Sequence, residues 1–195
     1  MEEVRLEFEK LRVEVENCKR CPLHKNRRKP VLGEGPIESQ IMLIGEAPGY
    51  WEDVQGKPFV GAAGKLLNEL LASAGLSRSQ VYITNVVKCR PPGNRDPKPS
   101  EVEACSPYLE RQLNLLKPKI ICTIGNHAAV KILSMFGFEP KPISQIHGKI
   151  FRASSLFGEI VIVPMFHPAS ALYRPPMRET LFRDWKVVAE VLGSI

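Results

Sequence analysis

The amino-acid sequence predicts an α/β protein: a three-layer α/β/α sandwich around a central, mainly parallel four-stranded sheet. Two observations carry this prediction. Short apolar runs rich in β-branched residues are typical of buried strands, and they occupy 41–44, 81–87, 120–124 and 160–163. Between them, apolar residues recur every three or four positions, as in amphipathic helices. Strands that alternate with such helices pair in parallel through right-handed crossovers, which places helices on both faces of the sheet.

The predicted helices have recognisable ends. Gly75 is a C-cap for the first helix, because glycine readily adopts the left-handed conformation found there. Ser100 and Glu103 have the spacing of a capping box at the start of the second, and Pro118 lies just past its end. We therefore expect helices over about 63–74, 100–116, 126–135 and 181–192.

Two connecting segments have distinctive composition. Residues 149–152 and 160–163 are expected to form a hairpin around Gly158. The segment 91–99, PPGNRDPKP, contains too many prolines for a helix or a central strand and is typical of a turn-rich loop.

Composition limits the class of protein. The chain has 195 residues, of which 44% are hydrophobic, and a formal net charge of +6. At roughly 100–200 residues per domain, we expect a single domain over 1–195. No apolar run approaches the ~18 residues of a membrane span, and the start lacks the basic and apolar regions of a signal peptide. A cytoplasmic monomer is expected, and the positive charge permits an anionic partner such as nucleic acid.

Candidate functional residues follow the predicted strands. Ligands of parallel sheets bind beyond the carboxyl ends of the strands. Glu46, in the turn 45–49, and His167 come directly after strands, whereas Asn85 is a polar residue inside an apolar strand. A tight turn and a structural histidine would explain the first two separately, but their shared edge favours a ligand site. The amide of Asn85 needs partners if it is buried.

Two familiar nucleotide motifs are absent. The sequence has no G-x-G-x-x-G fingerprint. The stretch 61–65, GAAGK, resembles part of a P-loop, but Phe59 occupies the position of the first required glycine and Leu66 that of the Ser or Thr. A nucleoside triphosphatase is therefore excluded.

The cysteines indicate a metal site. Cys18 and Cys21 form a C-x-x-C pair, and Cys89 and Cys105 flank the proline-rich loop. In a chain without export signals, this spacing favours metal ligation or redox chemistry over a disulfide. The spacing does not separate zinc from an iron–sulfur cluster. Cys122 lies in an apolar run and is expected in the core.

Several ordered motifs together resemble the uracil-DNA glycosylase superfamily, and most closely its family 4, the iron–sulfur type. The resemblance covers nearly the whole chain. It is carried by GEAPG at 45–49, GKPF at 56–59, TNVVKC at 84–89, HPA at 167–169 and the four cysteines. It implies an α/β/α sandwich that hydrolyses the bond between uracil and deoxyribose in DNA and leaves an abasic site. It also implies a [4Fe–4S] cluster on Cys18, Cys21, Cys89 and Cys105, with the cluster site formed by 18–21 and 89–105.

The resemblance assigns roles that suit the side chains. An extruded base needs a pocket that stacks on its face and reads its edge. Phe59 would stack on uracil, and the Asn85 amide would pair with uracil N3–H and O4. A neutral His167 would donate to O2 as negative charge develops on the leaving base.

The sequence departs from the best-known branch of the superfamily at two positions. Ala47 replaces the aspartate that positions the attacking water, so we expect Glu46 to position the water or to stabilise the sugar cation. Gly49 replaces the tyrosine that excludes thymine, and Glu52 is a candidate to fill that space. Glu46, Ala47, Pro48 and Gly49 are expected to line the uracil pocket, where backbone N–H groups of this turn assist binding.

The expected partner is uracil-containing DNA, single- or double-stranded. Leu172 and Arg174 lie in a stretch that resembles the family's wedge loop and would fill the gap left by the flipped nucleotide. Basic residues near the cysteines are candidate phosphate contacts: Lys19, Arg20, Lys25, Arg27, Arg28, Lys29, Arg90, Arg95 and Lys98. The alternatives are a cluster-containing glycosylase with broader base choice and a non-catalytic metal-containing nucleic-acid-binding protein. A replication clamp is an additional candidate partner that is unproven.

Overall fold

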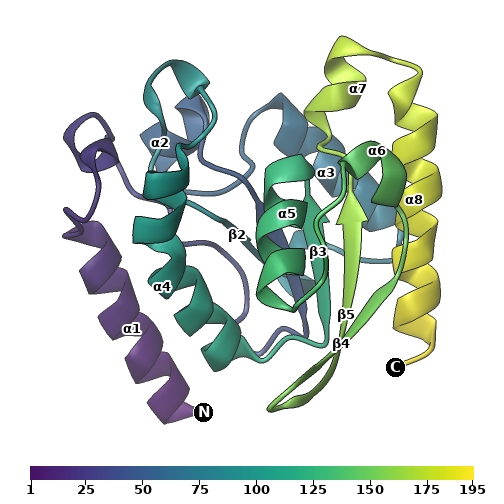
Figure 1. Cartoon of the computed structure of the whole chain (residues 1–195), viewed down its shortest axis with the longest axis horizontal. Helices are drawn as coiled ribbons and strands as arrows, with labels where there is room; N and C mark the ends of the chain where they lie inside the picture. The colour runs from purple at the N-terminus through teal and green to yellow at the C-terminus, as the bar shows by residue number, and fades with distance from the viewer.

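The computed structural model describes residues 1–195 and contains one five-stranded sheet with helices on both faces (Figure 1). The strand order is β2-β1-β3-β5-β4. Four strands are parallel, and only β4 is antiparallel to its neighbour. The strands are β1 (Ile41–Gly45), β2 (Tyr82–Asn85), β3 (Ile120–Ile124), β4 (Phe151–Ser155) and β5 (Gly158–Met165).

Two hydrophobic cores hold the helices on the sheet. On one face, α1, α4 and α5 pack with side chains such as Leu11, Leu109 and Ile132; on the other face, α3 and α8 pack with Leu67 and Trp185. The predicted α/β/α layering is therefore confirmed. The helices are α1 (Glu2–Glu16), α2 (Tyr50–Gln55), α3 (Ala62–Ser73), α4 (Pro99–Leu116), α5 (Asn126–Met135), α6 (Ile143–Ile146), α7 (Ala169–Tyr173) and α8 (Met177–Gly193). Among them, none combines the length and apolar character needed to cross a membrane.

The register of the sheet brings the carboxyl ends of the parallel strands to one edge. Gly45 at the end of β1 pairs with Asn85 at the end of β2, and Ile124 of β3 pairs with Met165 of β5. The short helices α2 and α7 lie beyond this edge, at the top of Figure 1. We call it the carboxyl edge. Residues far apart in sequence meet here.

The sheet has five strands, so the predicted number of four was wrong. The expected hairpin is present, and its first arm, β4, joins the sheet as an edge strand paired with β5. Only one β4 residue, Ala153, is buried. An edge strand with so little apolar surface gives a weak periodic signal, because it has little core to face.

The helix α4 begins earlier than the sequence predicted. Its first residue is Pro99, and the carboxylate of Glu101 accepts a hydrogen bond from the Lys98 backbone N–H (2.8 Å) and pairs with Arg95 (2.7 Å). Proline is favoured at the first helical position because it has no N–H to leave unpaired. The capping box of Ser100 and Glu103 is therefore not used.

The end of β2 also differs from the prediction, whereas α3 agrees with it. Strand β2 ends at Asn85, and Val86 and Val87 continue past the sheet while their N–H groups bond to the carbonyls of Gly45 and Glu46. The prediction of α3 is confirmed: it is followed by Gly75, whose φ of +77° provides the left-handed turn.

Candidate active site at the carboxyl edge

Phe59, Asn85 and His167 meet at the carboxyl edge. A Cβ atom on Gly45 would lie 2.4 Å from Asn85 Oδ1 and 2.9 Å from Phe59 Cζ, so both side chains rest against the Gly45 backbone. The rings of Phe59 and His167 are stacked, with centroids 5.7 Å apart and planes 26° apart. Gly45 therefore permits a close approach that any side chain would block.

The Asn85 amide is buried without a protein partner. The residue is 2% exposed, and its side chain makes no hydrogen bond within the protein. The amide oxygen and nitrogen are not among the fully buried side-chain atoms that lack a partner, so both remain accessible to a ligand or to water. This amide therefore supplies one acceptor and two donor hydrogens to whatever occupies the pocket.

A buried lysine holds the Asn85 backbone. Lys88 is 1% exposed, and its Nζ donates to the Asn85 carbonyl (2.7 Å), to Thr84 Oγ1 (2.6 Å) and to Gln112 Oε1 (2.6 Å). Burial lowers the pKa of Lys88 to about 7. Because Lys88 also lines the cysteine cavity, it connects that cavity to Asn85.

The Phe59 ring is fixed by its backbone. Phe59 has a φ of +49°, a left-handed conformation that is unfavourable for a bulky residue. The Arg78 guanidinium compensates by donating to the Phe59 carbonyl (3.0 Å) and to the Pro58 carbonyl (2.8 Å). A Cβ on Gly64 would lie 1.9 Å from the Phe59 oxygen, so α3 approaches this loop only because residue 64 is glycine.

His167 is held as a neutral hydrogen-bond donor. The Ala169 backbone N–H donates to Nδ1 (3.0 Å), so Nδ1 carries the lone pair and the proton of the neutral ring lies on Nε2. Burial lowers the pKa of His167 to about 4. At neutral pH, His167 is therefore an uncharged imidazole with a donor at Nε2.

The ring spacing defines how a base fits. A base between two parallel rings needs about 7 Å, twice the ~3.5 Å contact distance of carbon atoms. The Phe59 and His167 centroids are only 5.7 Å apart. A base therefore does not fit between the two rings as they lie in this structure.

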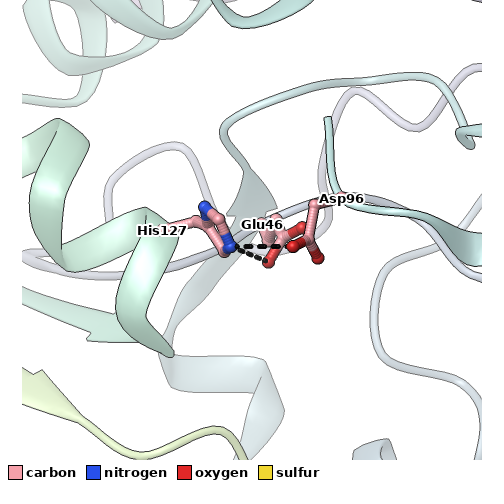
Figure 2. Close-up of side chains that lie close together, drawn as sticks. All are labelled: Glu46, Asp96 and His127. Carbon is pink, nitrogen blue, oxygen red and sulfur yellow. Dashed lines mark ion pairs between the residues drawn. The ribbon is translucent and has the colours of Figure 1, made fainter. Parts of the chain in front are cut away.

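Glu46 belongs to a second group at the same edge. Its Oε2 lies 3.9 Å from His127 Nε2, and the same nitrogen lies 3.3 Å from Asp96 Oδ2 (Figure 2). Asp96 comes from the proline-rich loop before α4, and His127 from the first turn of α5. Burial raises the pKa of Glu46, His127 opposes that rise, and the nearby Asp96 carboxylate adds to it.

Glu52 occupies the space next to Gly49. A Cβ on Gly49 would lie 3.3 Å from Glu52 Oε1, and a Cβ on Gly61 would lie 3.8 Å from Glu52 Oε2. The carboxylate therefore sits where a side chain at position 49 would begin. This geometry is compatible with the expectation that Glu52 fills that space.

The four cysteines of the predicted metal site line one cavity. Cys18, Cys21, Cys89 and Cys105 share it, whereas Cys122 is buried in β3. No three of the four sulfur atoms all lie within 4.8 Å of one another. Thiolates around one zinc ion lie about 3.8 Å apart, given Zn–S bonds of ~2.3 Å. The four sulfurs are thus spread more widely than a single zinc ion requires.

The surroundings of the cysteines determine whether their sulfurs carry protons. Arg27 donates to Cys89 Sγ (3.1 Å) and places a positive charge beside the sulfurs. Burial nevertheless raises the pKa of Cys89 to about 11, and it also raises that of Cys105. A bound metal would replace these thiol protons, since metals bind the thiolate form.

The predicted wedge residues are on the surface beyond the carboxyl edge. Leu172, in α7, is 51% exposed, and Arg174 directly follows this helix. Helix α7 lies at the top of Figure 1, on the same edge as the pocket. Both side chains are free to contact a ligand there.

Sequence reasoning missed Asp96, His127 and Arg78. His127 follows β3 by three residues, so the rule that drew attention to the ends of the other strands also identifies it. Asp96 had no such signal, because only the path of the proline-rich loop brings it to Glu46. Arg78 acts through backbone carbonyls, which leave no pattern in the sequence.

The fold and this edge define a protein of the uracil-DNA glycosylase superfamily, to which the chain belongs. The profile described as "Uracil DNA glycosylase superfamily" matches residues 32–188. The chain is 47% identical over 181 residues to a type-4 uracil-DNA glycosylase of Archaeoglobus fulgidus, covering 93% of this chain and 91% of the relative. It is 42% identical to the type-4 enzyme of Thermotoga maritima over 81% of this chain and 79% of the relative. A type-5 enzyme of Thermus thermophilus is 36% identical over 62% of this chain and 61% of the relative.

Proposed function

We propose that this protein is a DNA repair enzyme that excises uracil from DNA and leaves an abasic site. The observation that carries the proposal is the buried, unpartnered amide of Asn85 beside the Phe59 ring and the neutral His167 imidazole. A uracil ring offers a face to stack on and an edge with both a donor and acceptors. Membership of the superfamily and 47% identity to a type-4 uracil-DNA glycosylase support the same activity.

Binding of the base follows from the pocket geometry. The nucleotide rotates out of the helix, and uracil stacks on Phe59. The Asn85 oxygen accepts from uracil N3–H, and its NH₂ donates to O4. His167 Nε2 donates to O2 at the other side of the ring. These donors and acceptors are in place before the base arrives, so little reorganisation is needed during the reaction.

Bond breaking transfers electrons from the sugar to the base. The C1′–N1 bond breaks, its electron pair stays with uracil, and positive charge develops on the sugar. The hydrogen bond from His167 to O2 strengthens as negative charge grows there. Water then bonds to C1′ and releases a proton, and the departing uracil anion takes up a proton to leave as neutral uracil. Glu46, ionised, holds that water or stabilises the sugar cation, which is the role expected in the absence of an aspartate at Ala47.

The ion group around Glu46 predicts opposite effects of two substitutions on the pH dependence of excision. The Asp96 charge favours protonated Glu46, so Asp96→Asn lowers its pKa and keeps it ionised to lower pH. Protonated His127 has the reverse effect, so His127→Gln raises that pKa. We expect the acidic limb of the pH–rate profile to move downward for the first variant and upward for the second. Single-turnover rates between pH 4 and 8 measure it.

Glu190→Gln is the matched control for this pH experiment, since Glu190 is an exposed carboxylate on α8. Its limb should coincide with that of the wild type. If both substitutions at the ion group move the limb in the same direction, or not at all, Glu46 does not control the rate through its charge.

The cysteine cavity is proposed to hold a [4Fe–4S] cluster on Cys18, Cys21, Cys89 and Cys105. The wide spread of the sulfurs and the type-4 relatives support this assignment over a single zinc ion. When bound, the cluster ties the N-terminal segment to α4 and to the end of β2. Its ligation would therefore stabilise the fold around Asn85.

The cluster proposal predicts different behaviour for the half-buried Cys105 and the buried Cys122. Cys105→Ala should abolish the visible absorption of the purified protein and lower its melting temperature, because one of the four ligands is lost. Cys122→Ala should retain the absorption, since Cys122 lies outside the cavity. Absorption spectra, iron analysis and thermal unfolding of both variants measure this. Equal iron content in the two variants, or stoichiometric zinc in the wild type, would contradict the assignment.

The function itself is tested with oligonucleotides that carry one uracil. Incubation followed by alkali should cleave the strand at uracil and leave strands with thymine or hypoxanthine intact. Cleavage at hypoxanthine as well would favour the alternative of a cluster-containing glycosylase with broader base choice. Binding without cleavage would favour a non-catalytic nucleic-acid-binding protein. In the wedge role, Leu172 or Arg174 is proposed to fill the gap in the duplex.

A further inference from the structure

Two exposed aromatic rings lie at the start of α2, next to the pocket. Trp51 is 57% exposed and Tyr50 is 41% exposed, and the two rings meet edge to face with centroids 5.0 Å apart. Exposed aromatic rings of this kind offer flat faces on which bases stack. They are not part of either hydrophobic core.

Positive charge surrounds this aromatic pair. The guanidinium groups of Arg28 and Arg90 both lie 5.3 Å from the centroid of the Tyr50 ring. Neither is in an ion pair with a carboxylate; Arg90 Nε donates to the neutral Asn94 side chain (2.7 Å). Two cations beside an exposed ring provide phosphate contacts and a stacking surface together.

The pair is continuous with the uracil pocket. A Cβ on Gly61 would lie 3.9 Å from Trp51 Cδ1, and Gly61 is two residues from Phe59. Helix α2 also follows directly after the turn 45–49, at the carboxyl edge (Figure 1). Trp51 therefore lies beside the loop that carries Phe59.

We propose that Trp51 stacks on an unpaired base beside the extruded uridine, while Arg28 and Arg90 bind the adjacent phosphates. We call Tyr50, Trp51, Arg28 and Arg90 the aromatic platform. It is a single-strand subsite, because a paired base has no free face to stack on an indole ring. The inference rests on the proposed function, since it places the substrate strand relative to the uracil pocket.

Indole fluorescence can report on the subsite, because the chain has only two tryptophans. Trp185 is 1% exposed within the core, so a change of indole fluorescence on adding DNA reports on Trp51. The probe is a thymine-only single-stranded oligonucleotide, which contains no uracil. We expect it to quench the fluorescence of the wild type, and the matching duplex to quench it much less.

Two substitutions of Trp51 distinguish the loss of base stacking from a disturbance of the fold. Trp51→Ala should weaken binding of the single strand by roughly 5- to 100-fold, as expected for loss of one base–aromatic stack. Trp51→Phe should lose the fluorescence response but bind within about threefold of the wild type, because a phenyl ring also stacks. Fluorescence anisotropy of a labelled strand at fixed salt measures the affinities.

Phe157→Ala is the matched control. Phe157 is 53% exposed and also has a cation over its ring, from Lys117, but it lies in the β4–β5 turn at the opposite end of the sheet. It should leave binding unchanged. Wild-type affinity in Trp51→Ala, equal quenching by strand and duplex, or equal losses in Trp51→Ala and Phe157→Ala would overturn the subsite. These assays use DNA without uracil, so failure of strand binding at Trp51 and failure of uracil excision are observed separately.

Discussion

His167→Ala is expected to slow uracil excision by roughly 10²–10³-fold, the usual effect of removing one preorganised donor from a developing negative charge. The Ala169 N–H and the lowered pKa of about 4 keep this ring neutral, with its proton on Nε2. The donor therefore acts most strongly on the transition state, when charge accumulates on O2. Single-turnover rates on a uracil oligonucleotide measure the loss, and binding to the same strand should change little.

His167→Gln tests the donor itself. A glutamine amide also donates a hydrogen bond, so it should recover part of the rate lost in His167→Ala. The rate of the wild-type enzyme should show no inflection from His167 near pH 6.5, because the ring gains a proton only as the pH falls through about 4. A His167→Ala rate within about threefold of the wild type would show that the imidazole does not stabilise the leaving base.

Asn85→Asp is expected to change which base is excised. A buried carboxyl favours its neutral form, which donates to cytosine N3 and accepts from the cytosine amino group. The side chain at position 85 would then no longer complement the hydrogen-bonding edge of uracil. Losing such a pair of hydrogen bonds costs about 1–3 kcal/mol of discrimination between bases. We expect slower excision of uracil and new excision of cytosine. Oligonucleotides that carry one uracil or one unpaired cytosine measure both rates.

Asn114→Asp is the control, because it makes the same chemical change on an exposed position of α4. It should keep the base preference of the wild type. If Asn85→Asp also keeps that preference, the amide does not read the base edge, and its burial without a partner needs another explanation.

Much of the fold follows from local patterns. The strand β1 is five buried residues in a row, and α3 carries its apolar stripe up to Gly75, so both are recognisable without a structure. The edge strand β4 was harder to place in the sheet, since one face of it meets solvent. The start of α4 depended on Pro99 and Glu101 acting together with Arg95.

In the candidate site, too, some residues were recognisable from the sequence and others were not. His167 was identified from a strand end and Asn85 as a polar residue in an apolar strand. The shared register of β1 and β2 explains why Asn85 lies beside Gly45. Glu46 was identified too, but its partners Asp96 and His127 were not. Their contact depends on where a loop and the first turn of α5 meet in space.

By itself, the sequence determined the layers, the strand ends that carry polar groups and the chemical types of those groups. Backbone hydrogen bonding and burial act on neighbouring residues, so they leave a periodic pattern. Only the tertiary structure decided that Arg78 and Gly64 hold Phe59 in a strained conformation, that Lys88 joins the cysteine cavity to Asn85, and which carboxylate faces Glu46. These contacts join distant segments, and their energies depend on distance and burial, which chain order does not contain.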